Sequence, residues 1–181
     1  MVERKKGGVE VEFEHVCKLV DRYDPILKKK TERFNFSNPP CDPVELAHKL
    51  TQTMLNHNGI GLAAPQIGLP YRVFSLRTSP ILVCFNPLVV DVSSETVELE
   101  EGCLSFPSLI LKITRPSMIK ARFTLPNGET KTEKFIGMTA RAFLHELCHL
   151  DGRLFTNEVS KLDLDMAIRK ASKALRNKSV S

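Results

Sequence analysis

The spacing of apolar residues predicts a helix in the first third of the chain. Val44, Ala47 and Leu50 recur three positions apart, which places them on one helix face. Asp42 suits the N-cap position, because its carboxylate can accept hydrogen bonds from the free N–H groups of the first turn. Gly59 favours an end to the helix. We therefore expect a helix that begins after Asp42 and packs this face into the core.

The second half of the chain predicts two more helices. Thr139 can cap a helix that runs to about Leu150 and is ended by Gly152. A last helix is expected from about Asp163 to Leu175. The residues on its apolar side are Met166, Ala167, Ala171, Ala174 and Leu175.

Between these helices the pattern changes to short β-branched or alternating runs, which are typical of strands. The predicted strands are Tyr71–Leu76, Ile81–Phe85, Leu88–Val92, Thr96–Leu99, Met118–Leu125 and Thr130–Ile136. The last two flank Pro126-Asn127-Gly128, which is a strong hairpin turn signal. The order helix, many strands, helix, helix favours an α+β fold. We expect mixed or antiparallel β-sheets around the helix at 139–150, with an N-terminal and a C-terminal helix.

The length of 181 residues suits one domain. We expect residues 1–18 to be a disordered N-terminal extension and residues 19–181 to form a single domain, with a basic helix from about residue 163. No run of about 18 apolar residues occurs, so we expect no membrane-spanning segment and no membrane partner. The five cysteines form no CxxC pair, and the acidic N-terminus lacks the apolar core of a secretory signal. We therefore expect a cytoplasmic protein.

The formal net charge of +5 is unevenly distributed. Residues 166–181 hold five basic side chains and no acidic one, whereas the rest of the chain is close to neutral. A basic end on a neutral body indicates a charged C-terminal helix and not a fold that reads nucleic-acid sequence. We expect no sequence-specific binding of nucleic acid.

The segment His145-Glu146-Leu147-Cys148-His149 has the pattern HExxH and lies on a predicted helix. Residues four apart share a helix face, so both imidazoles can reach one metal ion. Glu146 lies about a third of a turn away and can address a water molecule on that metal. The motif therefore predicts a metal centre with a carboxylate beside it.

Two histidines leave the metal site incomplete, because a catalytic metal usually takes three protein ligands. Downstream of the motif, Asp163 and Asp165 are available. Upstream, Cys103 lies within Glu101-Gly102-Cys103-Leu104-Ser105, and a thiolate is a strong ligand for a borderline metal. The residues alone leave both sources open.

A third cluster reads Gly59-Ile60-Gly61-Leu62-Ala63-Ala64-Pro65-Gln66. It is not a dinucleotide-binding motif, because no predicted strand precedes it and its glycine spacing differs. Small residues would let a substrate lie against the backbone, and Gln66 offers an amide donor. A plain tight turn is the alternative explanation of the two glycines.

The three motifs, in this order, resemble those of the peptide deformylase family. The resemblance covers about residues 20–160 and includes Arg115-Pro116, Gly137 and Ala140-Arg141. It implies an enzyme that removes the N-formyl group from the N-terminal methionine of newly made polypeptides and releases formate. Its substrates would be N-formyl-methionyl nascent peptides. Some bacterial members dock on the ribosome through the C-terminal helix, which makes the ribosome an expected partner of residues 166–181.

The resemblance also implies roles for particular residues. Cys103, His145 and His149 would bind one divalent metal ion, which in this family is usually Fe²⁺, although zinc, nickel or cobalt can occupy the site. Glu146 would be the general base and acid. The residues implied to contact the substrate are the oxyanion donors Leu104 (backbone N–H) and Gln66 (side-chain amide), the backbone of Ile60 and Gly61, and Met138 and Ala142 in the methionine side-chain pocket.

Two positions depart from the family pattern. Members usually carry Asp before the second histidine and often Gln before the first, whereas this chain has Cys148 and Leu144. A thiol supplies neither the charge nor the full hydrogen-bonding strength of a carboxylate. If Arg115 is buried nearby, it needs another partner, and we expect Asp151 or a backbone carbonyl to take that place.

Two other functions are compatible with parts of the sequence. An HExxH metallopeptidase would cleave internal peptide bonds and take its third metal ligand from Asp163 or Asp165. A non-catalytic relative would bind formyl-peptides or ribosomes without turnover, and should lack a residue that activates the metal. Glu146 and Gln66 are both present, which favours the enzyme.

Overall fold

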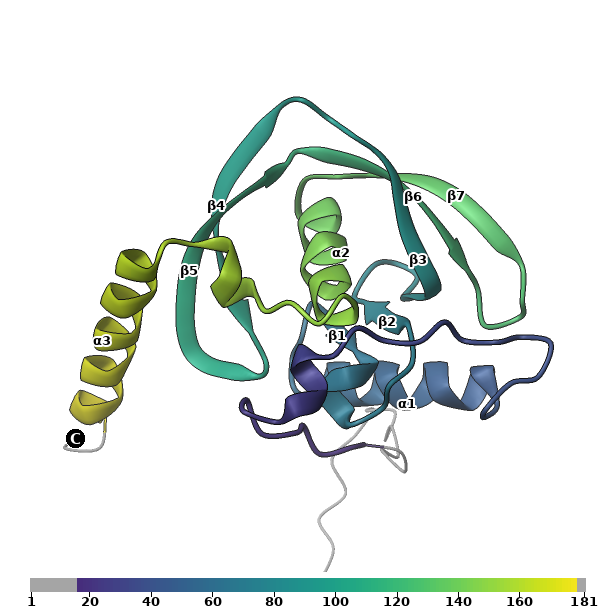
Figure 1. Cartoon of the computed structure of the whole chain (residues 1–181), viewed down its shortest axis with the longest axis horizontal. Helices are drawn as coiled ribbons and strands as arrows, with labels where there is room; N and C mark the ends of the chain where they lie inside the picture. Colours follow the sequence, from purple (N-terminus) through teal and green to yellow (C-terminus); the bar gives the residue numbers. More distant parts are fainter. Residues whose placement is uncertain (1–15, 179–181) are drawn as a thin grey trace, which may run out of the picture.

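The computed structural model of the chain describes residues 16–178, with side chains up to residue 173 (Figure 1). The helices of this part are α1 (Pro43–Asn56), α2 (Gly137–Leu150) and α3 (Lys161–Lys178), with 3-10 turns η1 (Pro25–Lys28), η2 (Ala64–Ile67) and η3 (Phe155–Glu158). The strands are β1 (Gly61–Ala63), β2 (Val73–Leu76), β3 (Leu82–Val92), β4 (Thr96–Cys103), β5 (Phe106–Pro116), β6 (Met118–Thr124) and β7 (Thr130–Ile136).

The strands form two antiparallel sheets. One has five strands in the order β1-β2-β3-β6-β7, and β4 pairs with β5 in a separate two-stranded sheet. The predicted α+β class is therefore confirmed. The strands predicted at Ile81–Phe85 and Leu88–Val92 are one strand, β3. Its pairing with β6 shifts between Phe85 and Leu88, and this irregularity accommodates Pro87 without ending the strand.

Strand β5 was not among the predicted strands. Its buried residues Leu109, Leu111 and Ile113 nevertheless occur at every second position, as expected of a strand with one buried face. Its next inward position is Arg115, which is 5% exposed. A charged residue at a buried position obscures the apolar alternation that marks a strand. The pairing of β4 with β5 also carries β4 as far as Cys103, beyond the predicted end at Leu99.

Helix α1 begins as expected. The Oδ1 atom of Asp42 accepts hydrogen bonds from the N–H groups of Val44 (2.7 Å) and Glu45 (3.0 Å). The prediction that Val44 faces the core is wrong, because its side chain is 61% exposed and Leu46 is buried instead. At about 100° per residue, Leu46 and Leu50 lie about 140° round the helix from Val44 on average, so the buried face is centred more than a third of a turn from Val44.

Helix α2 lies under the arch of β3–β7 and above α1 (Figure 1), and it contacts both sheets. Phe143 anchors it, with its ring centroid 4.9 Å from that of Phe74 and 5.2 Å from that of Phe135. Burying such a side chain contributes about 1.5–3 kcal/mol. The helix ends at Leu150 as predicted, but it begins before Thr139, at Gly137, whose φ of 57° favours glycine.

Helix α3 lies against β5, where Leu164 and Ala167 pack on the cluster that contains Leu111. Met166, expected on the apolar side, is 53% exposed. A helix that covers a two-stranded sheet buries only a narrow stripe, so much of α3 remains accessible. The side chains of Ala174 and Leu175 lie outside the described residues.

Most of the extension predicted for residues 1–18 lies outside the described part of the chain. Two hydrogen bonds tie the first described residues to the rest of the structure. The N–H of Cys17 donates to Oγ1 of Thr53 on α1 at 2.9 Å, and the N–H of Val20 donates to the carbonyl of Gln66 at 2.9 Å. Across residues 16–178, none of the helices combines the length and apolar character needed to cross a bilayer.

Candidate metal centre

Three potential metal ligands converge between the two sheets. Cys103 ends β4, while His145 and His149 lie one turn apart on α2, and the ligand atoms of all three are within 4.8 Å of one another. Sγ of Cys103 is 3.3 Å from Nε2 of His149. One thiolate and two imidazoles are a donor set that fits a borderline divalent metal. The residues that converge thus include Cys103, and not the exposed Asp163 or Asp165 of α3.

His149 is prepared for coordination by its burial. Its side chain is 1% exposed, and burial together with the neighbouring His145 lowers the pKa of His149 to about 3. The imidazole is therefore neutral, which is the form that binds a metal. Its Nδ1 atom is buried and has no hydrogen-bond partner among the described residues.

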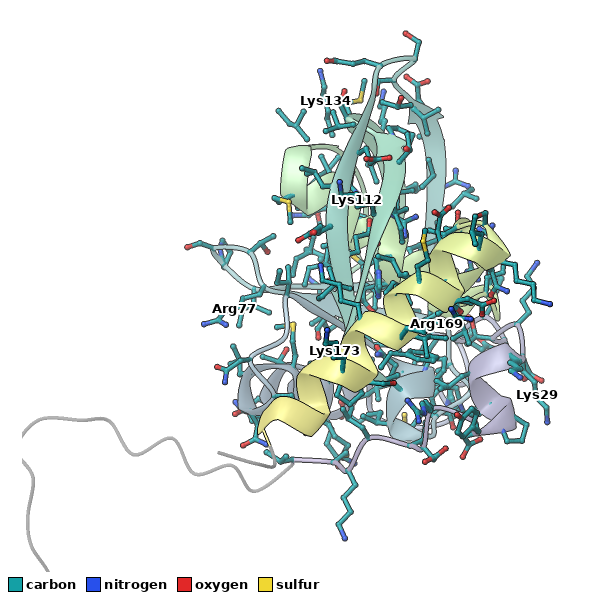
Figure 2. The ribbon with its side chains drawn as sticks, turned by 90° about the vertical axis from the view of Figure 1, so that its left-hand side faces the viewer. Lys29, Arg77, Lys112, Lys134, Arg169 and Lys173 are labelled. Atoms are coloured by element: carbon teal, nitrogen blue, oxygen red, sulfur yellow. The ribbon has the colours of Figure 1, made fainter. Side chains whose placement is uncertain are left out.

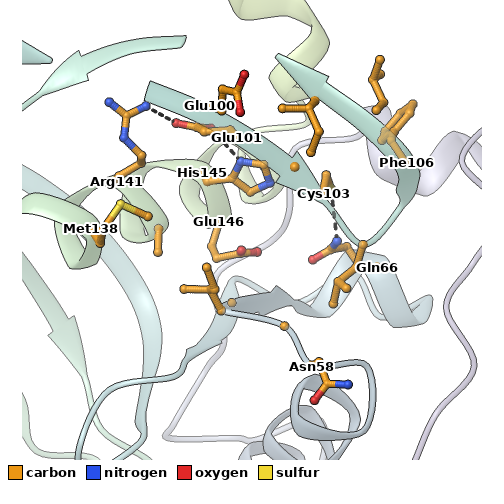
Figure 3. A pocket seen from close by; sticks show the side chains of 18 of the residues that line it. Asn58, Gln66, Glu100, Glu101, Cys103, Phe106, Met138, Arg141, His145 and Glu146 are labelled. Carbon is orange, nitrogen blue, oxygen red and sulfur yellow. Dashed lines mark hydrogen bonds and ion pairs between the residues drawn. The ribbon is translucent and has the colours of Figure 1, made fainter. Parts of the chain in front are cut away.

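His145 is oriented by a buried carboxylate. Its Nδ1 lies 3.0 Å from Oε2 of Glu101, which leaves Nε2 as the nitrogen that could bind a metal ion (Figure 3). Glu101 also accepts hydrogen bonds from Arg115 (2.6 and 2.9 Å) and Arg141 (2.7 Å). Burial would raise the pKa of Glu101, but the hydrogen bonds and charges of His145 and Arg115 outweigh it and hold the pKa at about 2. Glu101 therefore remains ionised.

No role was predicted for Glu101, although it stands in the motif that contains Cys103. Successive residues of a strand point to opposite faces, and this places Glu101 on the buried face of β4, opposite Leu111 of β5. Without β5, that strand had no partner, and the buried position could not be recognised.

Glu146 is buried beside the ligands. Its side chain is 4% exposed, and desolvation is the main reason that its pKa is raised to about 7. Oε2 has no hydrogen-bond partner in the described structure. A carboxylate with a pKa near neutrality can both take up and release a proton at the pH of the cell.

Small residues bring the backbone close to this carboxylate. A Cβ atom on Gly61 would collide with the carboxylate of Glu146, and one on Gly59 would lie 2.9 Å from Cδ1 of Leu104. Neither glycine has a positive φ. The two glycines are therefore explained by close approach of the backbone, and the tight-turn alternative is not supported.

Gln66, on η2, is held by both ends of its amide. Its Oε1 accepts from the N–H of Ala63 at 2.8 Å, and its Nε2 donates to Oγ of Ser105 at 3.1 Å. The same nitrogen lies 3.7 Å from Sγ of Cys103, so the amide is aimed at the proposed metal site (Figure 3).

These groups open into a cavity of about 340 Å³. The predicted substrate-contacting residues that line it are Ile60, Gly61, Gln66, Leu104, Met138 and Ala142. Ile60 and Met138 are more than half exposed, as befits the rim of an accessible site. Further lining residues that were not predicted are Asn58, Glu100, Phe106, Ser108, Leu109 and Ile110.

The expected re-pairing of Arg115 takes a different form from the predicted one. Arg115 is buried, but its partner is Glu101, whereas Asp151 pairs with Arg72 at 2.8 Å. Asp151 is the C-cap residue of α2, and its carboxylate pairs with Arg72 of the loop before β2. Sγ of Cys148 is 3.9 Å from Nη1 of Arg115.

Comparison with known proteins agrees with this geometry. The family model for polypeptide deformylase matches residues 16–165. The chain is similar to the peptide deformylase of Bartonella tribocorum, with 34% identity covering 89% of this chain and 94% of the relative. For that of Thermotoga maritima the identity is 36%, covering 80% and 79%. The crystal structure of a peptide deformylase from Synechococcus elongatus in complex with actinonin superposes with a TM-score of 0.81, at 28% identity and covering 95% of this chain and 93% of that one.

Proposed function

The chain belongs to the polypeptide deformylase family, whose metal-dependent enzymes remove the N-formyl group from the N-terminal methionine of new polypeptides, and we propose which of its residues carry out this reaction. The observation that supports the proposal most directly is the convergence of Cys103, His145 and His149, beside a cavity that Cys103, His145 and Glu146 line. The metallopeptidase and the non-catalytic binding protein are not favoured.

Cys103, His145 and His149 are proposed to hold the divalent ion. We propose Fe²⁺, with zinc, nickel or cobalt as alternatives that suit the same donor set. When bound, such an ion lowers the pKa of water to about 7 and so makes hydroxide available at neutral pH. Glu101 fixes the ring of His145 for this purpose through Nδ1.

Glu146 is proposed to move the proton. Its pKa of about 7 lets it accept a proton from the attacking water and then deliver it to the leaving amine. The close backbone of Gly61 restricts where the carboxylate can lie. The products are formate and a peptide with a free amine.

Gln66 and Leu104 are proposed to stabilise the negative oxygen of the tetrahedral intermediate. The side-chain amide of Gln66 is already oriented by Ala63 and Ser105, so little reorganisation is needed during the reaction. The backbone N–H of Leu104, next to Cys103, would be the second donor. Loss of one such donor typically costs about 10²–10³ in rate.

The walls of the cavity suggest how the substrate lies. We propose that the backbone of Ile60 and Gly61, at the free edge of β1, pairs with the extended peptide. Met138 and Ala142, on the cavity side of α2, would contact the methionine side chain. A formyl carbon carries only hydrogen, so a narrow site admits it and excludes an internal peptide bond.

The ribosome is proposed as the partner of α3, and the cytoplasm as the compartment. Arg169 and Lys173 are exposed on α3, and Figure 2 shows them on the same face as Lys112 of β5. These charges would attract backbone phosphates of RNA without reading its sequence. The side chains of Arg176 and Lys178 lie outside the described residues.

One experiment tests the reaction directly. Protein purified without oxygen is analysed for metal and then assayed for formate release from an N-formyl-methionyl peptide and for cleavage of casein. We expect one divalent ion per chain, release of formate and intact casein. Casein cleavage without formate release would favour the metallopeptidase, and binding of the peptide without release would favour the non-catalytic relative.

A further inference from the structure

Arg115 has one nitrogen turned away from its main partner. Its Nε and Nη2 donate to the two oxygens of Glu101, whereas Nη1 faces Sγ of Cys148 at 3.9 Å. The side chain of Arg115 is 6% exposed, so this third nitrogen depends on protein acceptors. A thiol is a weak acceptor and carries no charge. The buried guanidinium therefore needs a stronger negative group on this side.

Glu158 brings a carboxylate to the same thiol. Its Oε1 lies 3.7 Å from Sγ of Cys148, so the thiol stands between a guanidinium and a carboxylate. Glu158 ends η3, and its ion pair with Arg153 (3.5 Å) involves a side chain that is 57% exposed. Exposed ion pairs contribute little to stability. The contact with Cys148 is therefore the one that connects Glu158 to the interior.

The turn η3 also carries a residue that contacts a proposed metal ligand. Phe155 is 1% exposed, and its ring centroid lies 5.5 Å from that of His145. The same phenyl ring lies 5.6 Å from the ring of Phe106, on the wall of the cavity. Contacts that fix η3 therefore also restrict the imidazole of His145.

We propose that Glu158 is a positioning residue for the metal centre, and that the thiol of Cys148 transmits its effect. The thiol accepts a hydrogen bond from Arg115 and donates one to Glu158, so a chain of contacts continues through Glu101 to His145. The carboxylate that balances the outer nitrogen of Arg115 thus comes from η3 and not from α2. The inference rests on the metal site proposed above.

A double-mutant cycle on the whole protein tests this chain of contacts. The metal-free protein is titrated with Co²⁺, and both the dissociation constant and the sulfur-to-cobalt charge-transfer band are recorded. We expect Glu158→Gln and Cys148→Ala each to weaken Co²⁺ binding about tenfold and to shift the band, because groups behind a metal ligand typically contribute 10–100-fold. Since both residues act through one path, the double variant should bind about as weakly as either single variant.

Two controls separate positioning from general damage. Glu98→Gln, an exposed carboxylate on β4, should leave Co²⁺ affinity and the band unchanged. Cys148→Ser keeps a donor and an acceptor and should recover most of the affinity lost in Cys148→Ala. If Glu158→Gln does not fold, Glu158→Asp takes its place. This change keeps the negative charge but moves the carboxylate away from Cys148 by one methylene. The variant should lose part of its Co²⁺ affinity.

Unchanged Co²⁺ affinity and an unchanged band in the Glu158 variant would overturn the proposal. So would losses that multiply in the double variant, because they would mean that the two residues act independently. Failure of the proposed function looks different: the wild-type protein itself would then bind no metal at the site or release no formate.

Discussion

Oε2 of Glu101 lies 3.0 Å from Nδ1 of His145, while Oε1 of the same carboxylate accepts hydrogen bonds from Arg115 and Arg141. One buried carboxylate thus accepts hydrogen bonds from two buried guanidinium groups and orients an imidazole. This relationship joins the two-stranded sheet to α2 at the point where the proposed metal ligands converge, because Glu101 lies on β4, Arg115 on β5, and Arg141 and His145 on α2.

We expect Glu101→Gln to weaken both the fold and the metal site. An amide keeps the shape but not the charge, so Arg115 and Arg141 would be buried without their counter-ion. Breaking a buried ion pair in this way typically costs about 3–5 kcal/mol. Metal affinity should fall about 10–100-fold, because His145 loses the group that fixes its ring. Urea unfolding and chelator competition measure the two effects, and Glu98→Gln, on the exposed side of β4, should show neither.

Cys103→Ser should remove most of the activity by replacing the soft ligand. A hydroxyl is a poor ligand for a borderline metal, although it fills nearly the same volume. X-ray absorption of the metal-loaded wild type should find one sulfur and two nitrogens from the protein around the ion, and the sulfur should be missing in the variant. Cys41→Ser, at a partly buried cysteine before α1, is the matched control and should keep activity and sulfur coordination. A wild-type spectrum without sulfur would contradict the assignment.

Glu146→Gln should keep the metal and lose turnover. The amide has almost the same shape but cannot take up the proton of the attacking water, and such a group typically contributes about 10²–10⁴-fold. Metal content and the rate of formate release are the quantities to compare. If the variant kept more than about a tenth of the wild-type rate, proton transfer would have to come from another residue.

Much of the candidate site could be predicted because the residues that form it occur in short sequence motifs. Residues four apart on a helix share a face in any fold, so His145 and His149 could be paired from spacing alone. The choice of Cys103 over Asp163 and Asp165 depended on the family resemblance, since only tertiary structure shows which distant residue reaches the helix.

The parts that could not be predicted depend on pairing between strands. Glu101 becomes buried only when β4 pairs with β5, and β5 was missed because Arg115 interrupts its apolar alternation. For the same reason the partner of Arg115 was expected to be Asp151 or a backbone carbonyl, whereas it is Glu101. The direction of α1 was misjudged by part of a turn, so Val44 was placed in the core although the periodicity itself was correct.

Charge reversal on α3 should weaken binding to the ribosome. Arg169→Glu and Lys173→Glu change two exposed positions far from the proposed site residues in sequence, so stability and formate release from a small peptide should remain as in the wild type. Co-sedimentation with ribosomes at low salt should fall, and the salt dependence of the remaining binding should become less steep, because fewer phosphates are neutralised. Deletion of residues 169–181 with unchanged co-sedimentation would rule out a docking role for this helix.

Cys148→Asp should not raise kcat/KM as much as tenfold. A carboxylate at this position could accept a hydrogen bond from Nη1 of Arg115. It would also lie beside the carboxylate of Glu158, whose Oε1 is only 3.7 Å from Sγ of Cys148 in the wild type. Two carboxylates that share a site disfavour each other's ionisation, so much of the gain is lost. Combining the change with Glu158→Gln removes the repulsion, and activity should then exceed that of either single variant.

The comparison is made with one formyl-methionyl peptide and the same metal in all four proteins. A gain of tenfold or more from Cys148→Asp alone would show that Glu158 does not replace a carboxylate at position 148, and that this part of the site is simply incomplete.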